Sequence, residues 1–239
     1  MKKVMIGLVA VVLVAVGYIA MSHRGNEESA SSAPQIASQT ATSAPDLPPA
    51  QGSGLPQSYN AGFPFRDTSV LRPPAGQKVA IYEFDDLECP GCAQAMPVVH
   101  AAAERHGIPV EHHDFPWTEM HVWSFDAAVT ARYLQDDVSP QVADEFRKDV
   151  FANQRNIASK EDLSQFTQAW FQSHGRSLPF VLDPNGTCKT EVQADRALGD
   201  RVGVKSTPCV FVVTEHGFAY VQDLHQIDQM IETAQAGKA

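Results

Sequence analysis

The sequence predicts an α/β domain: a small mixed sheet with helices on both faces and an inserted all-helical lobe. Two observations predict it. The apolar, β-rich run Val79–Phe84, an Ala-rich helical segment and a second strand-like run, Ile108–Phe115, form a β-α-β unit, which pairs its strands in parallel through a right-handed crossover. Helix-spaced apolar residues over 117–202 then precede a strand at Cys209–Val213, a hairpin turn and an amphipathic helix at Leu224–Ala236.

The amino-terminal segment, residues 1–21, has the pattern of a membrane anchor or signal. Lys2 and Lys3 precede an uncharged run, Val4–Met21. This run is at the lower limit for a membrane-spanning helix and long for a signal peptide, so an uncleaved anchor is favoured over a removed signal. The positive residues before it place the rest outside the cytoplasm, where disulfides persist.

Residues 22–58 are rich in Ser, Ala and Pro and have neither helical nor strand periodicity. We expect a disordered tether there, followed by one folded domain at 59–239. The formal net charge is −10, and residues 59–239 carry all of it, because three basic residues offset three acidic ones before them. An acidic domain fits nucleic acid poorly, so we exclude that class of partner.

Within the expected helical lobe, breakers such as Asp136-Asp137 and Gly175 separate the helical segments. Ser139 and Ser159 stand where helix N-caps are expected. The predicted helices are His121–Gln135, Ser139–Asn153, Lys160–His174 and Thr187–Val202.

The motif Cys89-Pro90-Gly91-Cys92 lies where the first strand turns into the first helix. Unpaired N–H groups and the helix dipole at such a position favour a thiolate at Cys89. Half of a zinc site or a structural disulfide is the alternative, but zinc needs two more ligands at matching spacing, and no second Cys-x-x-Cys exists. The motif therefore favours redox chemistry, with neither a metal nor a cofactor.

Three features together resemble the thioredoxin superfamily: this motif, Pro97 in the following helix, and Thr207-Pro208 before a strand. The helical lobe narrows the resemblance to the DsbA-like branch of exported thiol–disulfide oxidoreductases, over about residues 75–236. The resemblance implies a cis Thr207–Pro208 peptide that faces the Cys pair and leaves the Thr207 backbone free for an extended substrate. An ordinary trans peptide opening an edge strand is the alternative.

The resemblance also implies a role for Glu83, six residues before Cys89. A buried acid at this position would relay the proton of Cys92, the resolving thiol, while Cys89 acts as nucleophile. Desolvation would raise the pKa of such a carboxyl toward neutrality. Alternatively, Glu83 faces solvent at an edge.

The expected function is that of a membrane-tethered, extracytoplasmic oxidoreductase, a monomer that oxidises cysteine pairs in exported proteins. A membrane partner of the DsbB or vitamin-K-reductase type would reoxidise it. Pro90-Gly91 lacks the imidazole that DsbA carries between its cysteines, and Glu88 adjoins Cys89. Because a nearby carboxylate disfavours a thiolate, we predict a milder oxidant than DsbA. The alternatives are a reductant in cytochrome or metal-site maturation and a non-catalytic Cys-x-x-Cys module that binds metal.

Two further cysteines, Cys188 and Cys209, could form a structural disulfide, because an even count of exported cysteines favours pairing. Two buried free thiols are the alternative. Five histidines could suggest a metal site, because imidazole is a common metal ligand. His112 and His113, however, are adjacent on a predicted strand, so their side chains point to opposite faces of the sheet. We interpret all five side chains as solvated. They are His100, His106, His112, His113 and His121.

Overall fold

The computed structural model describes residues 65–237. The expected anchor at 1–21 and the expected tether at 22–58 lie outside this range. Within residues 65–237, no helix has the length and apolar character needed to cross a membrane.

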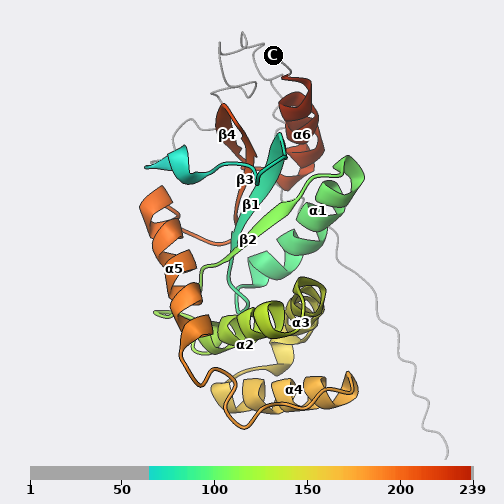
Figure 1. Ribbon diagram of the computed structural model, residues 1–239, viewed down its shortest axis with the longest axis vertical. Helices are drawn as coiled ribbons and strands as arrows, with labels where there is room; N and C mark the ends of the chain where they lie inside the picture. The colour runs from blue at the N-terminus through green and yellow to red at the C-terminus, as the bar shows by residue number, and fades with distance from the viewer. Residues whose placement is uncertain (1–64, 238–239) are drawn as a thin grey trace, which may run out of the picture. The chain divides into compact units, whose positions relative to one another are not determined.

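A four-stranded mixed sheet forms the centre of the described domain (Figure 1). Its strand order is β2-β1-β3-β4, with β2 parallel to β1 and the other neighbours antiparallel. This is the predicted β-α-β unit joined to a hairpin. The strands are β1 (Val79–Asp85), β2 (Val110–Asp114), β3 (Cys209–Thr214) and β4 (Gly217–Tyr220).

One face of the sheet is covered by α1 (Pro90–His106) and α6 (Ile227–Ala236). Alternate residues of β1 point to this face, so Val79 and Ile81 pack with apolar residues of both helices. The same alternation directs Glu83 and Asp85, at the other end of β1, toward α1. A proline at the first helical position starts α1, and Gly107 ends it in the left-handed conformation.

The opposite face is aromatic and is covered by α5 (Thr187–Val202). Phe84, Phe115 and Phe211 meet there in edge-to-face contacts. Gly199 lets α5 approach closely, since an added Cβ would overlap the Phe115 ring. The sequence predicts this helix, but as part of the helical lobe and not as the cover of a sheet face.

The helical lobe is made of α2, α3 and α4 with a short 3₁₀ turn, Gln154–Asn156, between the last two. Ser139 and Ser159 cap α3 and α4 as predicted, since each side chain accepts a backbone N–H three residues on. Phe146 and Trp170 pack edge to face at 5.1 Å in the lobe core. The bounds are Ser124–Asp137 for α2, Pro140–Asn153 for α3 and Lys160–Ser173 for α4.

The expected disulfide between Cys188 and Cys209 is wrong: both side chains are buried free thiols. Cys188 lies in the first turn of α5, whereas Cys209 packs with Val202, the last residue of that helix. A helix rises about 1.5 Å per residue, so the length of α5 separates the two sulfurs. A disulfide needs Cα atoms within about 7 Å.

Candidate active site at the amino terminus of α1

The Cys pair occupies the loop from β1 into α1. Cys89 is the extended residue directly before α1 and is half-buried, whereas Cys92, one turn into the helix, is fully buried. The backbone N–H of Asp86 donates to Cys92 Sγ at 3.4 Å. One sulfur is thus accessible to a reaction partner, and the other lies behind it.

Thr207–Pro208 is a cis peptide, as the resemblance implied, and it faces the Cys pair. Cys89 Sγ lies 3.4 Å from the Thr207 carbonyl oxygen. A Cβ added at Gly91 would lie 3.2 Å from Pro208 Cδ, so a glycine at this position lets the two segments meet closely. Of the predicted site residues, Cys89, Gly91, Thr207 and Pro208 are therefore brought together.

Hydrogen bonds to its sulfur lower the pKa of Cys89 to about 5. The largest cause is the side chain of Cys92, and Thr207 and the backbone N–H groups of Gly91 and Cys92 add to it, while burial acts in the opposite direction. Cys89 is therefore a thiolate at neutral pH. Thiolates, not thiols, attack disulfides.

The environment of Cys92 has the opposite effect. Burial raises the pKa of Cys92 far above its ordinary value, and the hydrogen bond to Cys89 and the nearby Asp85 carboxyl raise it further. Cys92 is therefore a protonated thiol. Any reaction that uses its sulfur has to move a proton.

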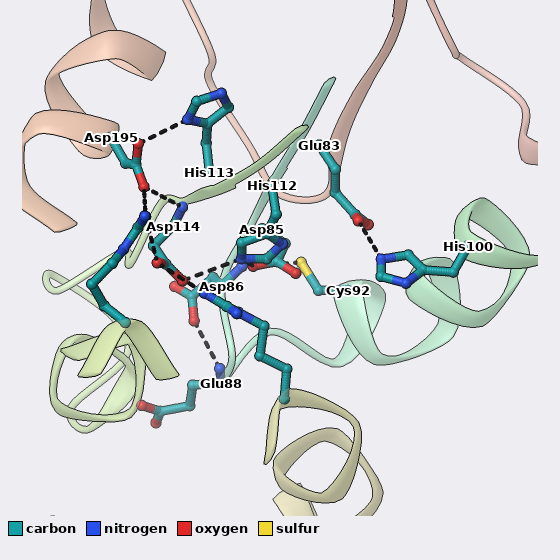
Figure 2. A network of polar contacts seen from close by, with 12 residues as sticks. Glu83, Asp85, Asp86, Glu88, Cys92, His100, His112, His113, Asp114 and Asp195 are labelled. Carbon is teal, nitrogen blue, oxygen red and sulfur yellow. Dashed lines mark hydrogen bonds and ion pairs between the residues drawn. The ribbon is translucent and has the colours of Figure 1, made fainter. Parts of the chain in front are cut away.

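Glu83 is fully buried on the α1 face of the sheet, so the predicted burial is confirmed and the solvent-facing alternative is wrong. Its Oε2 pairs with His100 Nε2 of α1 at 3.2 Å. The carboxyl beside Cys92 belongs instead to Asp85, which was not among the predicted site residues (Figure 2). The signal was present, because Asp85 follows Glu83 by two residues and must share its face of the strand.

Behind Cys92, a buried polar network crosses from β1 to the lobe (Figure 2). His112 of β2 lies 3.5 Å from Asp85 and 3.3 Å from Asp114. Arg147 of α3 contacts Asp114 at 3.3 Å, and the guanidinium holds the pKa of that carboxyl well below its usual range against the effect of burial. Burial lowers the pKa of His112, with Arg147 adding to the effect, which keeps the imidazole neutral.

Glu88 does not face the thiolate of Cys89, contrary to the reasoning from their adjacency. Its Oε2 accepts the backbone N–H groups of Trp123 and Ser124 at 2.7 and 3.0 Å, where α2 begins. Figure 2 shows its side chain directed away from Cys92. Glu88 therefore holds the lobe against the loop.

The interpretation of the histidines as solvated is also wrong. Each of the five contacts a carboxylate, and the opposed orientation of the adjacent pair on β2 is confirmed, because His113 turns to the aromatic face and pairs with Asp195 of α5 at 2.8 Å. Side-chain atoms of Glu83, Asp85 and His112 lie within 4.8 Å of one another. The carboxylate contacts are His100–Glu83, His106–Asp228, His112–Asp114, His113–Asp195 and His121–Asp86.

A sequence model of a thioredoxin family matches residues 75–233, more than half of the chain. The chain belongs to this thioredoxin family. No curated protein matches it.

Solved structures of DsbA and ScsC proteins share the thioredoxin fold of this family member. A double cysteine-to-alanine variant of Wolbachia pipientis α-DsbA1 superposes with a TM-score of 0.56 at 16% identity, covering 72% of this chain and 98% of its own. Proteus mirabilis ScsC in a transitional conformation gives 0.55 at 15% identity, covering 70% and 72%. N. meningitidis NmDsbA1 gives 0.50 at 17% identity, covering 69% and 88%. The predicted fold, a DsbA-like thioredoxin domain with an inserted helical lobe, is confirmed.

Proposed function

We propose that this protein is a thiol–disulfide oxidoreductase that exchanges disulfides with other proteins through Cys89 and Cys92. One observation carries the proposal: a half-buried sulfur with a pKa of about 5 lies one helical turn from a buried thiol and 3.4 Å from the carbonyl oxygen before a cis proline. A metal-binding module needs no such asymmetry between its two cysteines, since both must be thiolates to ligate.

In the oxidising direction, a substrate thiolate attacks Cys89 of the Cys89–Cys92 disulfide, and Cys92 leaves. A second substrate thiolate then attacks its partner in the mixed disulfide and displaces Cys89. The substrate gains a disulfide, and the protein keeps two reduced cysteines. Thr207, beside Cys89, would offer its backbone to the extended substrate chain.

The lowered pKa of Cys89 favours this direction, because stabilising the thiolate stabilises the reduced protein and makes its disulfide a stronger oxidant. A thiol pKa of about 3.5 accompanies the strong oxidant DsbA. The higher value here is consistent with a milder oxidant, although Glu88 is not the reason.

The setting in the cell belongs to the same proposal. The charge pattern of residues 1–21 supports export and attachment to the membrane. The substrates would be exported proteins with free thiols. A membrane partner of the DsbB or vitamin-K-reductase type would accept the electrons, and the tether at 22–58 would raise its effective concentration.

The test is a redox titration of Cys89–Cys92 in glutathione buffers, using the Cys188→Ser variant as a control outside the site. A potential above about −180 mV supports an oxidase, and one near about −270 mV makes the protein a reductant. The Cys92→Ser variant should accumulate a mixed disulfide on Cys89. The absence of a reversible two-electron couple, or stoichiometric metal bound at the Cys pair, contradicts the proposal.

A further inference from the structure

Two neighbouring carboxyl groups under α1 are buried with unsatisfied oxygens. Glu83 and Asp85 have exposed fractions of 0% and 1%. Among residues 65–237, neither oxygen of Asp85 and only one oxygen of Glu83 has a hydrogen-bond partner. A buried carboxylate without hydrogen bonds is costly, and the nearest partner of Asp85, His112, stays 3.5 Å away, so Asp85 is expected to hold a proton.

The two carboxyl groups face different neighbours. Glu83 turns along α1 toward His100, while Asp85 points to the sulfur of Cys92 (Figure 2). An atom of each carboxyl lies within 4.8 Å of the other, so a modest side-chain movement or one water would join them.

His100 connects this pair to solvent. Its side chain is 25% exposed and lines a groove of about 470 Å³ between α1 and α3, with Met96, Pro97 and Lys148 among the other lining residues. The groove starts beside Ala93, directly after Cys92. Protons can therefore reach Glu83 from this groove through His100.

We propose that Asp85, rather than Glu83, exchanges the proton with Cys92, and that Glu83 and His100 connect Asp85 to solvent through this groove. The proposal rests on the proposed function, since it assigns the proton transfer that accompanies disulfide exchange.

When a substrate thiolate bonds to Cys89, the Cys89–Cys92 bond breaks and its electron pair goes to Cys92 Sγ. The carboxylic acid of Asp85 gives its proton to that sulfur and becomes a carboxylate. On reoxidation, Cys89 first attacks a disulfide of the oxidising partner, one partner thiolate leaves, and Cys89 is joined to the other partner sulfur in a mixed disulfide. The Cys92 thiol then returns its proton to Asp85, and the Cys92 thiolate attacks Cys89, displaces the second partner thiolate and re-forms the Cys89–Cys92 disulfide.

The electrostatics around Asp85 support this role. Burial raises the pKa of Asp85 well above its ordinary value, and neighbouring carboxylates raise it further, while Arg147 acts in the opposite direction. Asp85 therefore holds its proton to a higher pH than an ordinary aspartate does. The groups that face it are Glu83 on β1, Asp86 in the loop, Cys92 on α1, His112 and Asp114 on β2, and Arg147 on α3.

The test measures the rate of the first exchange step against pH, by mixing the oxidised protein with a thiol peptide in a single turnover. Asp85→Asn should slow the step by on the order of 10²-fold, the range of general acid catalysis. In the wild type, the intrinsic rate constant, corrected for the thiolate fraction of the peptide, should fall as pH rises through the pKa of Asp85. Asp85→Asn should lack this decline, which a merely structural role of Asp85 would not remove.

Because Asp85 supplies its own proton in this first step, Glu83→Gln and His100→Gln should keep its rate and should instead slow the re-protonation of Asp85 after a jump to lower pH, followed by the infrared band of its carboxyl group. The double variant should be no slower than either single variant, because both interrupt one connection. Asp149→Asn removes a lobe carboxylate that pairs with Trp170 and is not among the charged groups around Asp85 and Cys92, so it should keep the wild-type rate. A full rate in Asp85→Asn, or a larger loss in Glu83→Gln, overturns the proposal. A wild type that exchanges no disulfides refutes the proposed function itself.

A measurement on the wild type covers the case in which Asp85→Asn does not fold. Infrared difference spectra between the oxidised and reduced protein should show a protonated carboxyl that is lost on reduction. An unchanged carboxyl signal overturns the proposal. So does a stoichiometric divalent cation in the purified protein, because a cation held by Glu83, Asp85 and His112 would replace the proton.

Discussion

At the scale of single residues, Cys89 and Cys92 differ because one helical turn separates a position with many donors from one with almost none. The Cys92 side chain, Thr207 and the backbone N–H groups of Gly91 and Cys92 all lower the pKa of Cys89. Cys92 receives one hydrogen bond, from Asp86, and is otherwise enclosed. Hydrogen bonding to the charged form lowers a pKa and desolvation raises it, so the same chemical group becomes a thiolate at one position and a thiol at the other.

This asymmetry makes the relative stability of the two redox forms depend on pH. Because the folded pKa of Cys89 is depressed, its stabilising contribution is complete above the unfolded pKa and lost as pH falls toward about 5. Only the reduced protein has this thiolate. The pKa of Cys92 is raised, so Cys92 does not titrate in this window.

We therefore expect the melting temperature of the reduced form to rise, relative to that of the oxidised form, between pH 5 and pH 8. Thermal unfolding of both forms at several pH values in this range checks it. In the Cys92→Ala variant, the rise in melting temperature should occur at higher pH, because the Cys92 side chain is the largest cause of the lowered pKa of Cys89. A constant difference across the range would contradict the lowered pKa.

At the scale of elements, the loop that bears the Cys pair and the helix α2 stabilise each other. Trp123, before the first turn of α2, provides no side-chain hydrogen bond to that turn. Glu88 takes this role from outside the helix by accepting two N–H groups. A carboxylate there also interacts favourably with the helix dipole.

We expect Glu88→Ala to destabilise the protein by about 1 kcal/mol, the usual cost of a lost helix cap, and to leave the Cys89 pKa unchanged. Denaturant unfolding measures the loss of stability, and the pH dependence of Cys89 alkylation measures the pKa of Cys89. Glu161→Ala, an exposed acidic residue in the first turn of α4, serves as a matched control. A clear fall in the Cys89 pKa in Glu88→Ala would restore the direct electrostatic effect that sequence adjacency suggested.

The sequence was sufficient to predict these elements because their signals are local. Ser139 and Ser159 mark helix starts, and alternation along β1 places its residues on two faces. The contacts of Glu88 and Asp85 were not predictable in this way. These contacts depend on which segment the fold brings opposite each side chain. Trp123 reaches Glu88, and Cys92 reaches Asp85, from other elements of the fold. Adjacency in sequence therefore gave the wrong neighbour for Glu88.

The position of α5 has a similar cause. Its amphipathic pattern predicts a helix with the observed bounds but does not say which surface it covers. The surface that α5 covers is decided by Gly199 of α5 and by the aromatic side chains that pack against it. These aromatic side chains come from β1, the end of β2 and β3. The same packing separates Cys188 from Cys209, which spacing alone had allowed to pair.

At the scale of the whole domain, the lobe and the segment that leads into it restrain the active-site loop through three connections. Asp86 accepts from Trp117 and from His121. Glu88 caps α2, and Gln154 of the 3₁₀ turn donates to the carbonyl groups of Leu87 and Cys89 at 2.8 and 3.1 Å. Because all three reach residues 86–89, we infer that the insertion holds the loop in the geometry that lowers the Cys89 pKa.

Gln154 is the connection best suited to a test, because its side chain bonds to the loop alone among the described residues. Gln154→Ala should speed amide hydrogen exchange over residues 86–92 and raise the Cys89 pKa toward its ordinary value, since a looser loop aligns its donors less well. Exchange in β4 and α6, at the end of the domain away from the lobe (Figure 1), should not change. Asn153→Ala is the matched control, because the Asn153 side chain donates to a carbonyl group of its own helix, α3. Unchanged exchange over 86–92 in Gln154→Ala would mean that the loop is held by its own turn and by α1, and that the lobe serves another purpose.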